Sequence, residues 1–427
     1  MKTTRRTFLY GCSATVTALA GTRLSFAGFG AATADARVLV VVFLRGGADG
    51  LSMVAPLAGP DRAFYEAARP HLALPVSGAG ALLPLDGRFG LSSVAAPLHD
   101  LYQRGKVGVV LACGLTHDTR SHFDAQEYME LGTPGTRSTS SGWLGRLLAT
   151  ASDVPTSVLF PALAVGSSQP TSLLGARGTV AMEDPDHFLL NTGPWRWQDA
   201  QRAALRRLCN ASSSPLHDAS SRAMDAVDLV ESLSLDSVPP AGGATYPENE
   251  IGRSLRLAAG MIRLDVGLRA VTLDVGGWDT HVEQAWSPTD GAFHALLGSL
   301  AQGLAAFFAD LEGSPTGSWG ERVTVVVMSE FGRRLRENAD RGTDHGHGSV
   351  MLVLGGGVRG GVYGTWPGLA PEQLYDGADL AITTDYRRVL SEIAIRRFAN
   401  PAISTIFPGY QGYTPLGVVE GRDLPPA

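Results

Sequence analysis

Residues 323–361 read VTVVVMSEFGRRLRENADRGTDHGHGSVMLVLGGGVRGG, and this stretch decides the fold. It contains two apolar runs, 323–328 and 350–354, of the kind that forms strands buried on both faces of a sheet. Four candidate metal ligands lie between the runs: Glu330, Asp344, His345 and His347. Carboxylates and imidazoles bind divalent metals, and ligands gather at the ends of sheet strands. The stretch therefore predicts half of a metal site, and the rest of the chain must supply the other half.

Further apolar runs predict strands at 37–44, 106–113 and 269–275. Amphipathic patterns and capping residues predict helices at 93–105, 121–132, 143–150, 199–208, 249–265, 288–312 and 386–398, with His294 on a polar face. Strands that alternate with helices indicate a three-layer α/β/α sandwich with a mostly parallel sheet. In such a sheet the loops after the strands converge on one site.

Two of these loops carry further candidate ligands. Asp49 follows the first strand in Arg45-Gly46-Gly47-Ala48-Asp49-Gly50, where it is either a metal ligand or part of a tight Asp-Gly turn. The glycine spacing does not fit a dinucleotide-binding loop. Asp279 and His281 follow the strand 269–275 and are either a pair of metal ligands or a surface cap with a solvated histidine.

Ser121 opens the helix 121–132 and has two interpretations. With Asp124 three residues later it is a helix N-cap. The same position would also place a nucleophile and an anion at the positive end of the helix. His117 and His122 flank Ser121, and we interpret each as a hydrogen-bonding loop residue.

The composition excludes several classes of protein. The 427 residues are 44% hydrophobic and carry a formal net charge of −6. The sequence has no run of basic residues of the kind that binds nucleic acid. Lys2 and Lys106 are the only lysines, which argues against a catalytic lysine in the folded part. Cys113 and Cys209 could form one disulfide, but two cysteines do not imply a disulfide-stabilised fold.

Residues 1–36 are interpreted as a twin-arginine signal peptide. Arg5 and Arg6 precede a weakly apolar run, and small residues before position 37 offer a cleavage site. Arg23 interrupts the run, which falls short of the roughly 20 apolar residues that a stable membrane anchor needs. We therefore expect a periplasmic or secreted protein that uses the twin-arginine export machinery. Residues 37–427 would form one domain, in which a Gly-, Pro- and Ser-rich insertion or cap at about 133–250 selects the substrate.

Five short segments carry a family resemblance: FLRGGADG (43–50), SHFDAQ (121–126), GGWDTH (276–281), SEFGR (329–333) and TDHG (343–346). Together with the export signal, they resemble the bacterial exported family called domain of unknown function 1501, over essentially the whole mature chain. That family looks like a distant relative of the alkaline phosphatase and sulfatase superfamily. The resemblance implies an alkaline phosphatase-like α/β/α core, commonly two divalent metals, and a Ser, Thr or Cys-derived nucleophile at a helix start.

The resemblance also implies roles for individual residues. Asp49 would be the metal-binding aspartate after the first strand, and Ser121 the nucleophile. Asp279 and His281 would be one ligand pair, and His345 or His347 the late ligand histidine. Glu330 would stand in the superfamily's Ser-Asp-His-Gly motif.

Two departures from the superfamily pattern stand out. Phe331 replaces a ligand histidine in that motif, which puts one metal position in doubt. Ser121 does not lie in the Cys-x-Pro-x-Arg motif of formylglycine sulfatases, which argues against sulfatase activity through a formylglycine nucleophile.

The resulting hypothesis is an exported metal-dependent hydrolase of phosphate or related esters, on a small-molecule or polymer substrate. One or two ions of zinc, manganese, calcium or magnesium would serve as cofactor, and Arg45 or Arg333 would clamp the anion. The alternative is a non-catalytic exported binding protein on a degenerate scaffold, which Phe331 favours.

Overall fold

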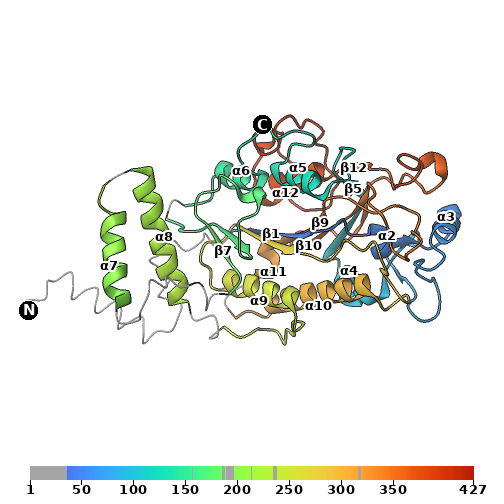
Figure 1. Ribbon diagram of the computed structural model, residues 1–427, viewed down its shortest axis with the longest axis horizontal. Coiled ribbons are helices and arrows are strands. Elements are labelled where there is room, and N and C mark those ends of the chain that lie inside the picture. Colours follow the sequence, from blue (N-terminus) through green and yellow to red (C-terminus); the bar gives the residue numbers. More distant parts are fainter. Residues whose placement is uncertain are drawn as a thin grey trace, which may run out of the picture.

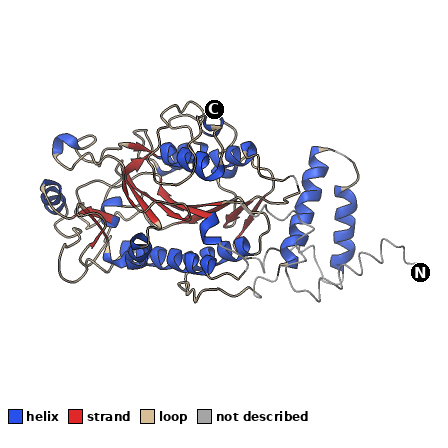
Figure 2. Ribbon diagram, turned by 180° about the vertical axis from the view of Figure 1, so that it is seen from behind, coloured by secondary structure: helices blue, strands red, loops and turns tan. Residues whose placement is uncertain are grey.

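The computed structural model describes residues 36–155, 157–184, 188, 197–212, 214–233, 238–315 and 319–427. The predicted signal peptide, apart from Ala36, lies outside the described residues. The centre is a nine-stranded sheet with the order β11-β5-β10-β9-β1-β8-β6-β7, and β12 pairs with β5. Helices cover both faces of this sheet (Figures 1 and 2). The predicted three-layer α/β/α sandwich is confirmed.

The main sheet is parallel except at one strand. Its strands are β1 (Val38–Leu44), β5 (Val107–Gly114), β6 (Ala162–Val165), β7 (Thr179–Met182), β8 (Ala270–Val275), β9 (Val323–Ser329), β10 (Ser349–Gly355), β11 (Gly361–Tyr363) and β12 (Thr384–Asp385). β1 is central, parallel to β8 on one side and to β9 on the other, whereas β10 is antiparallel to β5 and β9. All seven residues of β1 are buried, as expected of an apolar strand between two helical layers. A small second sheet holds β2 (Val54–Pro56), β4 (Phe89–Leu91) and β3 (Leu83–Pro84).

One helical layer contains α4 (Ala96–Gln103), α9 (Glu250–Arg263) and α10 (Ala292–Glu312); the other contains α5 (His122–Leu131), α6 (Trp143–Thr150) and α12 (Tyr386–Phe398) (Figure 1). The remaining helices are α2 (Gly50–Met53), α3 (Pro60–Ala68), α7 (Gln198–Cys209), α8 (Pro215–Ser232), α11 (Trp319–Arg322), α13 (Ile403–Ile406) and the 3-10 turns η1 (Ser93–Ala95), η2 (Thr171–Leu173) and η6 (Pro371–Gln373).

α10 is the core helix of its layer. It is the one described helix that is long and apolar enough to cross a membrane by length and composition. Its apolar residues are instead packed in the core, among them Phe293, Leu300 and Phe307. The predicted polar position of His294 is wrong, because this side chain is buried as well. Burial lowers the pKa of His294, so the imidazole is neutral in the core.

The predicted insertion at 133–250 is corrected in part. β6 and β7 lie in this range, yet they extend the main sheet beyond β8. α6 packs in the helical layer above the sheet (Figure 1). Among the described residues of this range, α7 and the unpredicted α8 lie apart from the sheet and its helical layers, side by side beyond the β7 end of the sheet in both views. Cys209 at the end of α7 and Cys113 in β5 are free thiols, so the two form no disulfide.

Candidate metal centre

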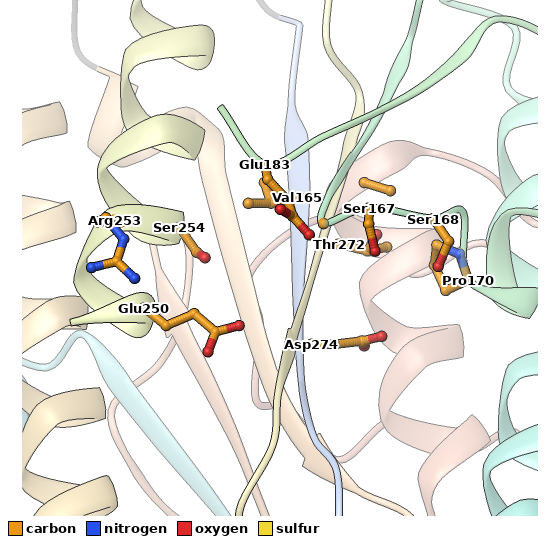
Figure 3. Close-up of a pocket in the computed structure, with 12 residues that line it drawn as sticks. Val165, Ser167, Ser168, Pro170, Glu183, Glu250, Arg253, Ser254, Thr272 and Asp274 are labelled. Atoms are coloured by element: carbon orange, nitrogen blue, oxygen red, sulfur yellow. The ribbon is translucent and has the colours of Figure 1, made fainter. Parts of the chain in front are cut away.

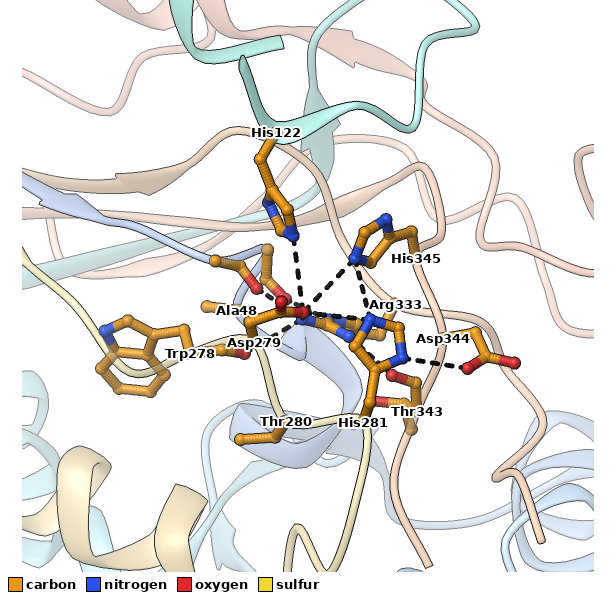
Figure 4. A network of polar contacts seen from close by, with 12 residues as sticks. Ala48, His122, Trp278, Asp279, Thr280, His281, Arg333, Thr343, Asp344 and His345 are labelled. Carbon is orange, nitrogen blue, oxygen red and sulfur yellow. Dashed lines mark hydrogen bonds and ion pairs between the residues drawn. The ribbon is translucent and has the colours of Figure 1, made fainter. Parts of the chain in front are cut away.

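Four side-chain atoms converge at the carboxyl edge of the sheet: Nε2 of His122, His281 and His345 and Oδ1 of Asp279 (Figure 4). The distances from Asp279 Oδ1 to the three Nε2 atoms are 3.4 Å for His122, 3.1 Å for His281 and 3.3 Å for His345. The Nε2 atoms of His281 and His345 are 2.9 Å apart. Ligand atoms of His122, Asp279 and His345 all lie within 4.8 Å of one another, a spacing that one metal ion can span.

Three separate parts of the chain bring these residues together. His122 is the first residue of α5, Asp279 and His281 follow β8, and His345 precedes β10. The loop after β8 crosses closely over the loop after β1. A Cβ atom on Gly46 would lie 2.5 Å from the backbone nitrogen of Asp279, and φ of Gly46 is +121°. Only glycine permits this approach, which sets the position of Asp279.

The outer nitrogens of two of the histidines are held by carboxylates. His122 Nδ1 lies 2.7 Å from Glu330 Oε1, and His281 Nδ1 lies 3.1 Å from Asp344 Oδ1. Burial alone would raise the pKa of Glu330, but hydrogen bonds from His122 and Gln126 bring it below its usual value. The pKa of Asp344 is lowered too, because hydrogen bonds from Asn338 and His281 outweigh burial. Both carboxylates are therefore ionised, and each accepts the Nδ1 proton of its histidine.

The third histidine has a backbone partner. His345 Nδ1 lies 2.8 Å from the carbonyl oxygen of Arg120, which can only accept, so this Nδ1 also carries the proton. In the neutral state all three Nε2 atoms are then lone-pair acceptors that point toward Asp279. Nε2 of His122 is buried without a hydrogen-bond partner among the described residues. Histidine ligands of metals typically donate their other ring proton to a carboxylate or carbonyl, so the donor set fits a cation.

Arg333 fixes the carboxylate of Asp279. Its guanidinium is fully buried and donates to Asp279 Oδ1 at 2.6 Å and to the carbonyl oxygens of Gly46, Gly47 and Thr343. Burial alone would raise the pKa of Asp279, but Arg333 holds it at about 2. The structure therefore does not support the predicted role of Arg333 as an anion clamp, because its N–H groups donate to acceptors inside the protein.

Arg45, the other predicted anion clamp, is also engaged. Its guanidinium pairs with Glu130 and, at 2.8 Å, with Asp274, and it stacks over Phe43. Among the described residues, both predicted anion-binding arginines are thus paired with carboxylates of the protein and are not free to bind an anion at the cluster.

Asp49, a predicted metal ligand, takes part in a buried ion pair instead of the metal cluster. Its carboxylate is fully buried and pairs with Arg69, with Nη1 at 2.6 Å and Nη2 at 3.0 Å. It also accepts hydrogen bonds from Ser52 and Gln284. Burial opposes ionisation, but Arg69 lowers the pKa of Asp49 below its usual value. All its acceptor positions serve this pair and its neighbours, so the structure does not bring Asp49 to the cluster.

The other predicted residues take supporting positions. Ser121 is the N-cap of α5, with Oγ accepting from the backbone nitrogen of Asp124 at 3.4 Å. The ring of His347 stacks on Tyr375 at a centroid distance of 4.0 Å, outside the cluster. Glu330 and Asp344 orient ligand histidines instead of facing the centre. The structure thus brings together Asp279, His281 and His345 of the predicted set.

The sequence analysis missed His122, which it interpreted as a loop residue. Phe331 helps to place His122. The centroid of the Phe331 ring lies 4.8 Å from that of His122 and 5.0 Å from that of His345. Phe331 thus forms an apolar wall beside His122 and His345. One signal could have found His122: it occupies the first turn of a helix that directly follows a buried strand.

The cluster is open on one side. The side chain of Asp279 is 48% exposed and that of His281 is 38% exposed, whereas those of His122 and His345 are about half as accessible. Structural zinc sites are closed, and catalytic sites keep a position for water or substrate. An open cluster of this kind fits the second class.

The fold and the site together define an α/β/α sandwich protein with a candidate metal centre of His122, Asp279 and His345, and His281 lies beside it. The chain belongs to the family described as "Protein of unknown function (DUF1501)", whose model matches residues 99–399. This match confirms the family that the sequence motifs predicted. No curated protein matches the chain.

Solved structures similar to this chain include a lipoteichoic acid synthase from Listeria monocytogenes, with 9% identity, 91% of this chain and 76% of that chain covered, and a TM-score of 0.35. A protein of the alkaline phosphatase superfamily from Vibrio parahaemolyticus has 10% identity, coverages of 77% and 62%, and a TM-score of 0.29. A phosphonate monoester hydrolase from Silicibacter pomeroyi has 10% identity, coverages of 87% and 73%, and a TM-score of 0.34.

Proposed function

We propose that this protein is an exported metal-dependent hydrolase of phosphate or related esters, with a single divalent ion held by His122, Asp279 and His345 and with His281 beside them. One observation carries the proposal: three imidazole nitrogens lie within 3.4 Å of one carboxylate oxygen of Asp279, and two of them, from His122 and His345, form with it a group that one ion can span. Each imidazole is locked in this orientation by an acceptor on its other nitrogen. Without a cation, these acceptors would face one another.

The ligand types favour particular metals. Imidazole suits zinc, iron and other transition metals, whereas calcium and magnesium prefer sites made only of oxygen. A set in which histidines outnumber the carboxylate therefore supports zinc or iron over calcium or magnesium. With Phe331 as an apolar wall and Asp49 paired with Arg69, the described residues supply one metal position here.

A bound ion of this kind polarises an ester oxygen and lowers the pKa of a coordinated water. The protein contributes the geometry. Glu330 orients His122, Asp344 orients His281, and Arg333 keeps Asp279 ionised. Ser121 Oγ accepts a hydrogen bond from the backbone of Asp124 and makes no hydrogen bond to the cluster among the described residues, so we propose water as the attacking group and keep Ser121 as the alternative nucleophile.

The test combines metal content with hydrolysis. We expect about one equivalent of metal in the mature protein by elemental mass spectrometry, and its loss in His122→Ala and Asp279→Ala. His99→Ala, in the opposite helical layer, should keep the metal. Hydrolysis of aryl phosphate, phosphonate and sulfate esters should disappear in the same two variants and persist in Ser121→Ala. Loss of hydrolysis in a Ser121→Ala protein that keeps its metal would restore the serine mechanism.

The binding-protein alternative also has support. Both predicted anion clamps, Arg45 and Arg333, are paired inside the protein. A protein that binds its metal but hydrolyses none of these esters would favour this alternative.

Export by the twin-arginine pathway, with residues 1–36 as the signal, is part of the proposal. The paired arginines support it. Arg5→Lys/Arg6→Lys in the full-length precursor should block its appearance in the periplasm.

A further inference from the structure

A cavity of about 360 Å³ opens at the carboxyl end of β6, between β8 and the first turns of α9 (Figure 3). β6 ends at Val165, whose partner in β8 is Leu273, so β8 continues past the end of its neighbour. The gap left beside Asp274 forms the cavity. None of the residues that line it belongs to the metal cluster.

The wall of the cavity is acidic. Glu183, Glu250 and Asp274 line it, against one guanidinium, that of Arg253. Asp274 has a partner in Arg45, but Arg45 is shared with a second carboxylate. Glu183 and Glu250 pair with no cation in the part of the chain that the structure describes. An acidic wall with too few cations attracts a positively charged ligand.

Hydroxyl groups supply a second, independent feature. Ser167, Ser168, Ser254 and Thr272 line the same cavity (Figure 3). Thr272 is only 5% exposed, and no side-chain hydrogen bond occupies its hydroxyl among the described residues. This hydroxyl is not one of the fully enclosed polar atoms that lack a partner, so it is reached from the cavity, where it can donate to and accept from a ligand.

A bare metal ion does not fit this cavity. Among the described residues, only the His122 cluster brings three ligand atoms close enough for one ion. The carboxylates of the cavity are therefore too far apart to bind one ion together. The volume of about 360 Å³ is at the lower end of the range for small-molecule sites. The ligand must have several atoms that reach separate walls.

We propose that this cavity binds a small polyhydroxylated molecule with a protonated amine, such as an amino sugar. The ammonium group would lie between Glu183 and Glu250, and hydroxyl groups of the ligand would pair with Thr272 and the serines. The proposal does not depend on the metal centre or on its activity.

The test is isothermal titration calorimetry in an amine-free buffer, at a pH where the amine is protonated. Glucosamine is the probe, and glucose is the matched neutral compound. We expect glucosamine to bind roughly tenfold or more tightly than glucose, because a charge-assisted hydrogen bond is lost with the amine. Equal affinities, or no binding of glucosamine, would overturn the proposal.

Variants then locate the binding site. Glu183→Gln/Glu250→Gln should weaken glucosamine binding roughly tenfold, and Thr272→Val should weaken it several-fold. Glu372→Gln, a charge change at an exposed residue outside the cavity, should leave it unchanged, and circular dichroism verifies folding. The affinity should be the same after the protein has been stripped of metal with a chelator. Wild-type affinity in the double variant would overturn the assignment, whatever happens to ester hydrolysis.

Discussion

Replacing Asp49 by alanine tests whether this residue stabilises the fold or binds the metal. The carboxylate of Asp49 is fully buried against Arg69, whose guanidinium is also fully buried. In Asp49→Ala the charge of Arg69 stays in the core without its partner, and Gln284 and Ser52 lose an acceptor. Breaking a buried ion pair from one side costs about 3–5 kcal/mol.

This cost translates into a melting temperature. A folded chain of about 390 residues has an unfolding entropy near 0.8 kcal/mol/K, so the expected drop in Tm is about 4–6 °C. Because the pKa of Asp49 is lower in the folded state, its contribution is complete above the unfolded pKa and is lost as the pH falls through the folded value. The difference between Asp49→Ala and wild type should therefore shrink in acid.

The assay is differential scanning calorimetry beside elemental analysis of the same samples. Asp49→Ala should melt early but keep its metal, whereas Asp279→Ala should lose its metal. An Asp49→Ala protein that melts at the temperature of metal-free wild type and contains no metal would refute this reasoning. Asp49 would then be the ligand that the sequence suggested.

Three further outcomes are expected. Glu330→Ala should reduce metal affinity about 10–100-fold in a chelator competition, because it removes the acceptor that orients His122, and an unchanged affinity would contradict that role. Ser121→Ala should destabilise the protein by about 1 kcal/mol in urea titrations through loss of the α5 cap, and a neutral result would show that the cap contributes nothing. Cys209, which is partly exposed, should react with a thiol reagent in the native protein, whereas Cys113 should react only after unfolding, because burial raises its pKa; equal rates would contradict this placement.

Much of the architecture could be predicted from local patterns in the sequence. The strands β1, β5, β8 and β9 are continuous apolar runs, and caps such as Asp385 mark where helices begin. β6 and β7 escaped because each has four residues inside a region rich in glycine and proline. Length and composition there favour loops, and only pairing with β8 reveals a strand.

The site was harder to predict because its roles depend on distant partners. A strand end places Asp279 and His281 well, since the chain must turn there. Arg333 was expected to bind substrate, but its carboxylate partner lies 54 residues away in the sequence. His122 depends on the direction in which α5 leaves the sheet. Sequence spacing contains neither kind of information.

The central position of β1 has a consequence for synthesis of the chain. β1 is the first strand of the described residues to be synthesised, but its partner in β9 begins 285 residues later, at Val323, and its partner in β8 begins at Ala270. At about 5–20 residues per second, the ribosome needs roughly 15–60 s to cover that distance. During this time VLVVVFL is an unpaired, uncharged β-forming segment, which is the type most prone to aggregate. The strand order therefore leaves this segment without its partner in β9 until most of the chain has been made, and shielding of the segment during that time would limit aggregation.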